Sequence, residues 1–194
     1  DSYEDALGSY MMKLSSLDLS EHDSRALSVM LHCIGDFERI SDHAVNIAEA
    51  AEELSTKDEH FSKKALSELA VYTRAIKDVV DMSFKVFDDE DRALAREVEP
   101  LEEVIDYLNE EIKKRHIKRL RKGKCTIELG FILSDITTAY ERVSDHCSNI
   151  AVCIIEVNDN EFDTHEYMIA LKGKDSEGFE REVAGLQQKY VLPE

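Results

Sequence analysis

Two copies of one polar motif contain the side chains of this sequence that are best suited to binding a metal ion. Residues 38–48 read ERISDHAVNIA and residues 141–151 read ERVSDHCSNIA, so eight of eleven positions are identical. On a helix, side chains four residues apart lie above one another. Each copy therefore predicts a row of oxygen ligands, formed by Glu38, Asp42 and Asn46 in the first copy and by Glu141, Asp145 and Asn149 in the second.

A third acidic row precedes the second motif and consists of Glu102, Asp106 and Glu110. Antiparallel packing of two neighbouring helices would bring this row against Glu141 and Asp145. Carboxylates that face one another raise each other's proton affinity unless a cation neutralises them. Ligation by oxygen alone favours hard ions, namely iron(III), manganese, magnesium or calcium. The acidic rows therefore predict a metal-binding site between helices.

A structural interpretation of the same carboxylates competes with metal binding. The chain has 42 acids among 194 residues, so roughly nine acid pairs would be spaced four apart by chance. The acids would then be exposed and paired with Arg39 and Arg142. His43 and His146 lie about 140° round the helix from the glutamates, which favours a hydrogen-bonding or packing role beside them. The Glu-x-x-His spacing of ferritin-like di-iron helices is absent, which argues against an oxygen-activating enzyme.

The two motifs belong to an internal repeat. They are 103 residues apart, and extending the alignment backwards with a shift of two residues places Asp1 and Asp5 opposite Asp106 and Glu110. The sequence therefore predicts two related units, each of about a hundred residues in full, of which the first has lost its beginning. A helix that should complete the first bundle is therefore missing or supplied otherwise, and we expect that upstream sequence was removed. We divide the chain into a truncated first repeat, a second repeat, and a C-terminal link with a helix that packs on the bundles: 1–56, 57–158 and 159–194.

Long helices are predicted by the apolar periodicity and by the scarcity of proline and glycine, which occur two and seven times. A first helix carries Leu7, Met11 and Leu14. Ser20 and Asp23 form a capping box that begins a second helix, which extends to about residue 54. The apolar stripe of this second helix consists of Leu27, Met30, Ile34, Phe37, Ile40, Ala44, Ile47 and Ala51.

A third helix is expected to begin at a second capping box, formed by Thr56 and Glu59. The acidic run at 88–91 ends this helix. Its apolar face consists of Leu66, Leu69, Ile76, Val80 and Phe87.

The remaining helices complete an all-α fold of long antiparallel rods. A fourth helix is kinked or restarted near Pro100, reaches Arg121 and is capped at Gly123, which tolerates left-handed geometry. A fifth helix is expected over about 125–157, and a shorter last helix over about 176–190. No segment shows the two-residue alternation that a β-sheet would require.

Composition excludes several classes of function. The formal net charge of −18 would repel the phosphates of nucleic acids over most of the surface. The apolar runs are shorter than the roughly 18 to 20 residues that cross a bilayer, and no signal peptide is recognisable. No nucleophile elbow, phosphate loop, zinc-protease helix or dinucleotide fingerprint is present, so we predict neither an organic cofactor nor an enzyme. Reduced cytosolic thiols are expected at Cys33, Cys125, Cys147 and Cys153.

Basic residues concentrate in one segment, Lys113–Lys124, which holds eight of the 24 lysines and arginines. Cations in the last turns of a helix are stabilised by the helix dipole by roughly 0.3–1 kcal/mol each, which explains the cluster structurally. A docking patch for the anionic inner leaflet of a membrane, or for an acidic partner, is the functional alternative.

The string DFERISDHAVNIAE at 36–49 resembles the signature of the PhoU family, whose members regulate phosphate uptake, and the second motif resembles it again. The resemblance covers most of the chain. It implies two three-helix bundles related by a pseudo-twofold axis, the first one truncated here, and multinuclear iron or zinc sites built from E/D-x-x-x-D motifs. It places Glu38 and Asp42 in one site, with Asp1 left from the preceding helix, and Glu102, Asp106, Glu141 and Asp145 in the other. Asn46, Glu110 and Asn149 are secondary candidates.

The tail of the chain, FDTHEYMIALKG and a further helix ending in KYVLPE, is similar to the C-terminal cytoplasmic region of bacterial sodium/phosphate cotransporter-related proteins. This likeness implies a non-enzymatic regulatory domain at the inner face of the cell membrane. Its expected partner is a membrane transporter domain of the same or another chain, and a homodimer is a further expected assembly. Two alternatives stay open: a free-standing PhoU regulator of a phosphate ABC transporter and its sensor kinase, and a carboxylate-bridged di-metal enzyme.

Overall fold

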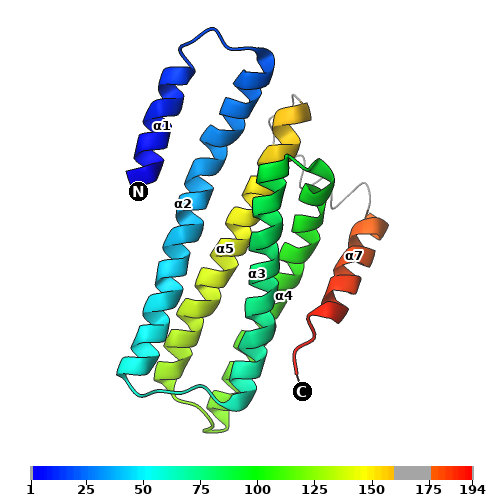
Figure 1. Cartoon of the computed structure of the whole chain (residues 1–194). Coiled ribbons are helices and arrows are strands. Elements are labelled where there is room, and N and C mark those ends of the chain that lie inside the picture. Colours follow the sequence, from blue (N-terminus) through cyan, green and yellow to red (C-terminus); the bar gives the residue numbers. More distant parts are fainter. Residues whose placement is uncertain (1, 160–175, 194) are drawn as a thin grey trace.

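The computed structural model describes residues 2–159 and 176–193, and every regular element within them is an α-helix (Figure 1). The all-α prediction is therefore confirmed. The helices are α1 (Ser2–Leu14), α2 (Glu21–Thr56), α3 (Lys63–Asp89), α4 (Arg92–Arg121), α5 (Ile127–Asp159) and α7 (Ser176–Lys189). None of the helices within these ranges combines the length and the apolar character needed to cross a membrane.

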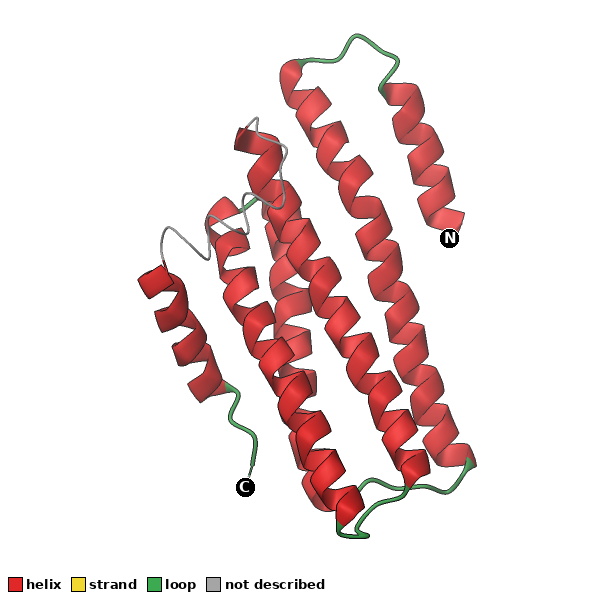
Figure 2. Ribbon diagram, turned by 180° about the vertical axis from the view of Figure 1, so that it is seen from behind, coloured by secondary structure: helices red, strands yellow, loops and turns green. Residues whose placement is uncertain are grey.

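Three helices form a bundle, α2 and α7 pack on two of its sides, and α1 packs on α2. Helices α3, α4 and α5 contact one another pairwise and make up the second repeat. The hairpin of α1 and α2 lies along α5, which it contacts through α2, whereas α7 lies along α4 (Figures 1 and 2). Each repeat thus contributes its motif-bearing helix, α2 or α5, to the contact between the repeats.

The first predicted capping box is confirmed, and the second is wrong. Ser20 caps α2, and its hydroxyl oxygen accepts a hydrogen bond from the Asp23 amide at 3.1 Å. Thr56 ends α2 instead of opening the next helix, because the Glu59 amide bonds back to the carbonyl of Leu54 at 3.0 Å. The N-cap of α3 is Ser62, six residues further on.

The boundaries of α4 follow the predicted signals. Glu90 is left-handed, with φ 50°, and ends α3, and Asp91 caps α4 by accepting hydrogen bonds from the first-turn amides. Helix α4 is assigned as one element across Pro100, so it does not restart there. At the other end, Gly123 has φ 62°. This conformation suits a residue without a Cβ, which is why a glycine closes the helix.

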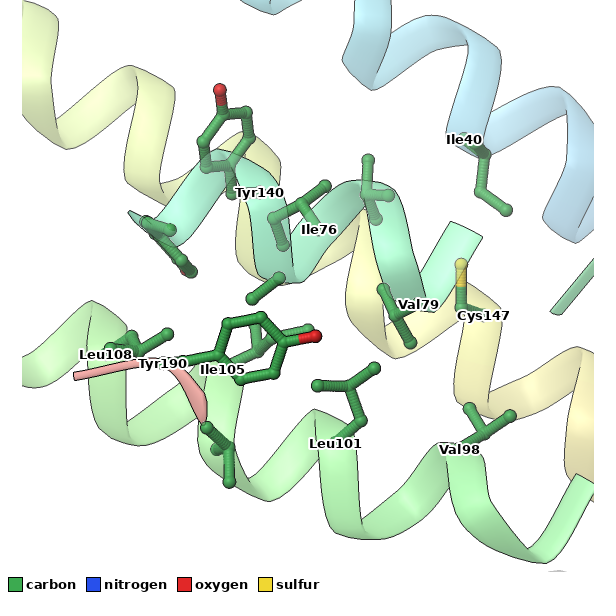
Figure 3. Packing of buried hydrophobic residues seen from close by; sticks show 14 of the residues in the cluster. Ile40, Ile76, Val79, Val98, Leu101, Ile105, Leu108, Tyr140, Cys147 and Tyr190 are labelled. Carbon is green, nitrogen blue, oxygen red and sulfur yellow. The ribbon is translucent and has the colours of Figure 1, made fainter. Parts of the chain in front are cut away.

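The core follows the predicted stripes only in part. Leu27, Ile40 and Ile76 are buried as expected, but Met30 and Leu66 are 48% and 52% exposed. The predicted stripes left out small and polar residues that belong to the buried faces. Each predicted stripe was therefore rotated slightly round its helix, away from the face that is buried. Exposed or half-exposed exceptions also include Leu7, Ala44 and Ala51. The buried positions that the stripes omitted include Val29, Cys33, Ala50, Ala65, Tyr72, Ala75, Val79 and Val86. Val79 is seen among the core residues in Figure 3.

The C-terminal segment is anchored by its last residues. Tyr190 is 2% exposed and lies beside Ile105 and Leu108 of α4 (Figure 3). Its hydroxyl donates a hydrogen bond to Asp78 of α3, and Lys189 forms an ion pair with the same carboxylate at 2.8 Å. The predicted link before α7 falls mostly on residues 160–175, outside the described residues.

Candidate functional site

The two motifs meet where α2 packs along α5. The rings of His43 and His146 stack with their centroids 5.7 Å apart and their planes 23° from parallel. His146 Nδ1 donates to Asp36 Oδ1 at 2.8 Å, and the Asn149 amide donates to the same oxygen at 3.1 Å. The motif histidines therefore connect the two repeats, in the hydrogen-bonding and packing role that their spacing favoured.

This junction is not symmetric, although the motifs are. The position that matches Asp36 in the second repeat is Ala139, so His43 lacks the carboxylate that its counterpart His146 has. His43 Nδ1 instead lies 3.4 Å from the side-chain nitrogen of Asn46. Burial and then the neighbouring imidazole of His146 lower the pKa of His43. The first-repeat histidine is therefore held in its neutral form over a wider pH range.

In the second repeat, Glu141 of α5 faces α4. The amide of Asn109 donates to Glu141 Oε2 at 2.8 Å, and Lys113 Nζ lies 3.8 Å from the same oxygen. Asp106, Asn109 and Lys113 are three and four residues apart, so they share one face of α4. Helix α4 therefore approaches the second motif, as predicted. The groups that interact with Glu141, however, are the amide of Asn109 and the amine of Lys113 and not the predicted carboxylates.

A buried tyrosine from α3, Tyr72, lies near the polar layer formed by Glu141, Asn109 and Lys113. The Tyr72 ring packs edge-on against Tyr140 at 5.1 Å, and the side chain is fully buried. Burial, and after it the charges of Glu141 and Asp106, raise the pKa of Tyr72. Its hydroxyl has no hydrogen-bond partner among the described residues. All three helices of the bundle therefore place a polar group near Glu141.

Two members of this layer, Asn109 and Tyr72, were missed in the sequence. Asn109 could have been found, because it lies three residues after Asp106 and four before Lys113 on one helix face. Tyr72 carries no such signal, since tyrosines at helical spacing are ordinary core residues.

The other predicted ligands pair mainly with side chains of their own helix. Arg39 Nε lies 3.7 Å from Glu38, and Arg142 Nη1 lies 3.2 Å from Asp145. These are the arginine pairs of the structural interpretation. Asp42 is exposed, Glu110 pairs with Lys114 at 3.0 Å, and Glu102 is half-buried on α4. Asp1 lies outside the described residues.

The oxygen donors are of the type that hard cations prefer, but they are not gathered into a cage. Within residues 2–159 and 176–193, no group of three or more His, Cys, Asp and Glu side chains is placed to hold a metal ion. Lys113, Arg39 and Arg142 supply part of the positive charge that a metal would otherwise provide. Metal binding by the motif carboxylates stays a prediction, and no step below depends on it.

That prediction has a direct test in the double substitution Asp42→Asn/Asp145→Asn. If the motifs bind metal, the metal that copurifies with the chain falls to background, because one carboxylate of each repeat has lost its charge. Helicity should be unchanged, since both side chains are at least partly exposed. Plasma mass spectrometry measures the metal, and circular dichroism measures the helicity. The exposed pair Asp18→Asn/Asp81→Asn is the control, and equal metal content in all three proteins excludes these ligands.

The fold and the site define a helical-bundle domain built from two repeats, whose matching ExxSDHxxNIA motifs face each other on α2 and α5. The profile of the PhoU domain family matches residues 1–51 and 71–154 of the chain, which therefore belongs to the PhoU family.

Two curated relatives carry names from phosphate transport. The chain is 33% identical over 133 residues to the phosphate-specific transport system accessory protein PhoU homolog 1 of Thermotoga maritima. The aligned region covers 69% of the chain and 56% of that relative. It is 25% identical over 132 residues to the phosphate-specific transport system accessory protein PhoU homolog of Deinococcus radiodurans. This aligned region covers 66% of the chain and 59% of that relative. The chain thus spans less than two thirds of either relative. No solved structure matches it.

Proposed function

We propose that this chain is a non-enzymatic regulatory domain that acts on a phosphate transporter. The observation that carries the proposal is the pair of family motifs on two helices that pack together, both within the residues matched by the PhoU profile. The printed names of both relatives, accessory proteins of a phosphate-specific transport system, support the same class of function.

The transporter that it serves is the finer part of the proposal. We favour a sodium/phosphate cotransporter, in the same chain or in another, because the C-terminal residues are similar to the cytoplasmic region of such proteins. This places the domain at the inner face of the cell membrane, where Lys113–Lys124 would contact anionic lipid or an acidic partner, and where two copies could pair. A free-standing regulator of a phosphate ABC transporter is supported at least as strongly, by the names of the relatives.

The proposal predicts that phosphate uptake by cells of the source organism changes when this chain is deleted. Uptake of labelled phosphate is measured at low and at high external phosphate, in the wild type, the deletion strain, and the deletion strain complemented with the chain. We expect the deletion to change the uptake rate and the wild-type chain to restore it, because a regulator acts on transport and not on phosphate chemistry. A complementing chain with the exposed Glu52→Gln substitution is the control and should restore uptake equally.

The same cells distinguish the two transporters. Deletion of the cotransporter should abolish the effect of the chain on uptake, whereas deletion of the ABC transporter should leave it in place. The reverse result identifies the free-standing type of regulator. Uptake that is unaffected by the chain in every strain contradicts the proposal. Turnover of phosphoesters by the purified, metal-loaded protein would favour the di-metal enzyme instead.

A further inference from the structure

We propose that a basic pocket between the first turn of α3 and the last turns of α4 binds an anion that carries phosphate groups. This inference does not rest on the proposed role in phosphate transport, because it is argued from the charges of one end of the bundle and not from the motifs; it makes specific the anion contact proposed above for the basic segment Lys113–Lys124. The two helix ends lie side by side, at the end of the bundle where α4 connects to α5 (Figure 1).

The pocket has a volume of about 440 Å³, within the range of small-molecule sites. Six of its eight described lining residues are cationic and one is anionic, although the whole chain has a net charge of −18. Cations gathered in one concave region concentrate anions there. The lining residues of this basic pocket are Ser62, Lys64, Glu68, Arg115, Lys118, Arg119, Lys122 and Lys124.

Among the described residues that line the pocket, Glu68 is the one carboxylate, and two arginines of the same pocket neutralise it. Glu68 is fully buried, with Arg119 Nη1 at 2.6 Å and Arg115 Nη1 at 3.4 Å from its two oxygens. These ion pairs fix both guanidinium groups at the wall of the pocket. Arg119 Nη2 is buried and has no acceptor among the described residues, so this guanidinium has donor capacity left over.

Four lysines of the pocket form no ion pair with an acidic side chain of the described residues. Lys64, Lys118, Lys122 and Lys124 are exposed, and in the described part of the chain none has a carboxylate oxygen within 4.0 Å of its amine. In contrast, Lys113 and Lys114, which begin the same basic segment, pair with Glu141 and Glu110. Within Lys113–Lys124, the lysines without such a partner are the ones that line the pocket.

The helix dipole does not account for this charge. It stabilises the cations at the end of α4, but it disfavours cations at the beginning of a helix, where α3 has Lys63 and Lys64 and no acid in its first turn. Ser62 caps α3 and satisfies the Ala65 amide, while the amides of the first two helical residues have no acceptor within the helix. The N-terminal end of α3 thus adds positive potential and free N–H donors to the lysines, as in other anion sites.

Phosphate groups fit this combination of donors. A phosphate group carries up to two negative charges and several acceptor oxygens, so it can satisfy lysines, arginines and helix amides together. A pocket of this size accommodates two linked phosphates better than one. The same chemistry occurs in a free phosphate ligand and in the headgroup of an anionic lipid, and these two sources can be separated experimentally.

The test compares the full chain with the variant Lys64→Gln/Lys118→Gln/Lys122→Gln. Its control is Lys13→Gln/Lys77→Gln/Lys85→Gln, which removes the same charge at exposed positions elsewhere. Titration calorimetry measures the binding of sodium pyrophosphate and of inorganic phosphate. Sedimentation with phosphatidylcholine vesicles, with and without phosphatidic acid, measures headgroup binding. We expect the wild type and the control to bind with similar affinity, and the pocket variant to bind at least about tenfold more weakly, because it has lost three charge-assisted contacts to the anion.

Saturable pyrophosphate binding that the pocket variant loses assigns a free phosphate ligand. Binding only to phosphatidic acid vesicles, lost in the same variant, assigns a lipid headgroup. Equal weakening in both triple variants, or no binding in either arm, overturns the proposal. A measurement on the wild type alone guards against misfolded variants: the ligand should protect Lys118 and Lys122, but not Lys77, from acetylation detected by mass spectrometry. Equal acetylation of all three lysines with ligand present would also refute the pocket.

Discussion

The substitution Glu68→Ala is expected to lower the free energy of unfolding by about 3–5 kcal/mol, because it removes one partner of a buried ion pair and leaves the other uncompensated. Glu68 has no exposed side-chain surface, and the Arg119 side chain is 13% exposed. In the variant, Arg119 would stay in the wall of the bundle without its carboxylate. Urea unfolding followed by circular dichroism measures the loss.

Two further variants identify the cause of that loss. Glu97→Ala removes an exposed glutamate from α4 and should change the stability by less than about 0.5 kcal/mol. Glu68→Leu combined with Arg119→Leu should cost less than Glu68→Ala alone, since replacing both charges by apolar groups leaves no buried ion unpaired. A double variant as unstable as Glu68→Ala would show that shape, and not charge, determines the effect.

Tyr190→Ala should lower the free energy of unfolding by about 3–5 kcal/mol, the range found when a large buried aromatic side chain is truncated. The ring of Tyr190 fills space beside Ile105 and Leu108 of α4, and its hydroxyl bonds to Asp78 of α3 (Figure 3). Losing the ring removes the contact that anchors the C-terminal segment to two helices of the bundle. Thermal and urea unfolding measure the change.

Tyr190→Phe separates the ring from the hydroxyl. It keeps the ring and should cost only about 1 kcal/mol, because Asp78 retains its ion pair with Lys189. Val191→Ala, next in sequence but 65% exposed, should be nearly neutral. If Tyr190→Ala proved as mild as Val191→Ala, the C-terminal segment would contribute little to the stability of the bundle.

Most of the fold could be predicted because its signals are local. Caps such as Ser20 and Asp91 act within one helical turn, and the long stretches without proline or glycine permit only long helices. The start of α3 was mispredicted because one sequence pattern can either begin a helix or end one. Thr56 with Glu59 has the spacing of a capping box, but hydrogen bonding back into α2 wins there, and a serine beside a buried phenylalanine starts α3 instead.

The site was less predictable, because its partners are distant in sequence. Spacing placed Glu141 on one face of its helix, but the contact with Asn109, 32 residues away, depends on the register of α4 against α5. The same holds for Glu68, which lies 51 residues from Arg119. No local pattern distinguishes that glutamate from the exposed acids around it. The sequence shows the basic segment Lys113–Lys124, but only the structure shows its pairing with Glu68 and its approach to Lys64.

Helix α5 packs along α2 of the first repeat and along α3 and α4 of the second, and the ring of Phe37 on α2 adds contacts to Phe84 and Phe87 of α3. Side chains in a tightly packed interior cannot adjust continuously. A tilt or a slide of α5 must therefore repack its contacts with α2 and its contacts with α3 and α4 together. Any ligand that prefers one position of α5 on one flank would therefore alter binding on the opposite flank, and the influence would run equally in both directions. The duplicated architecture thus makes α5 a rigid element that the two repeats share.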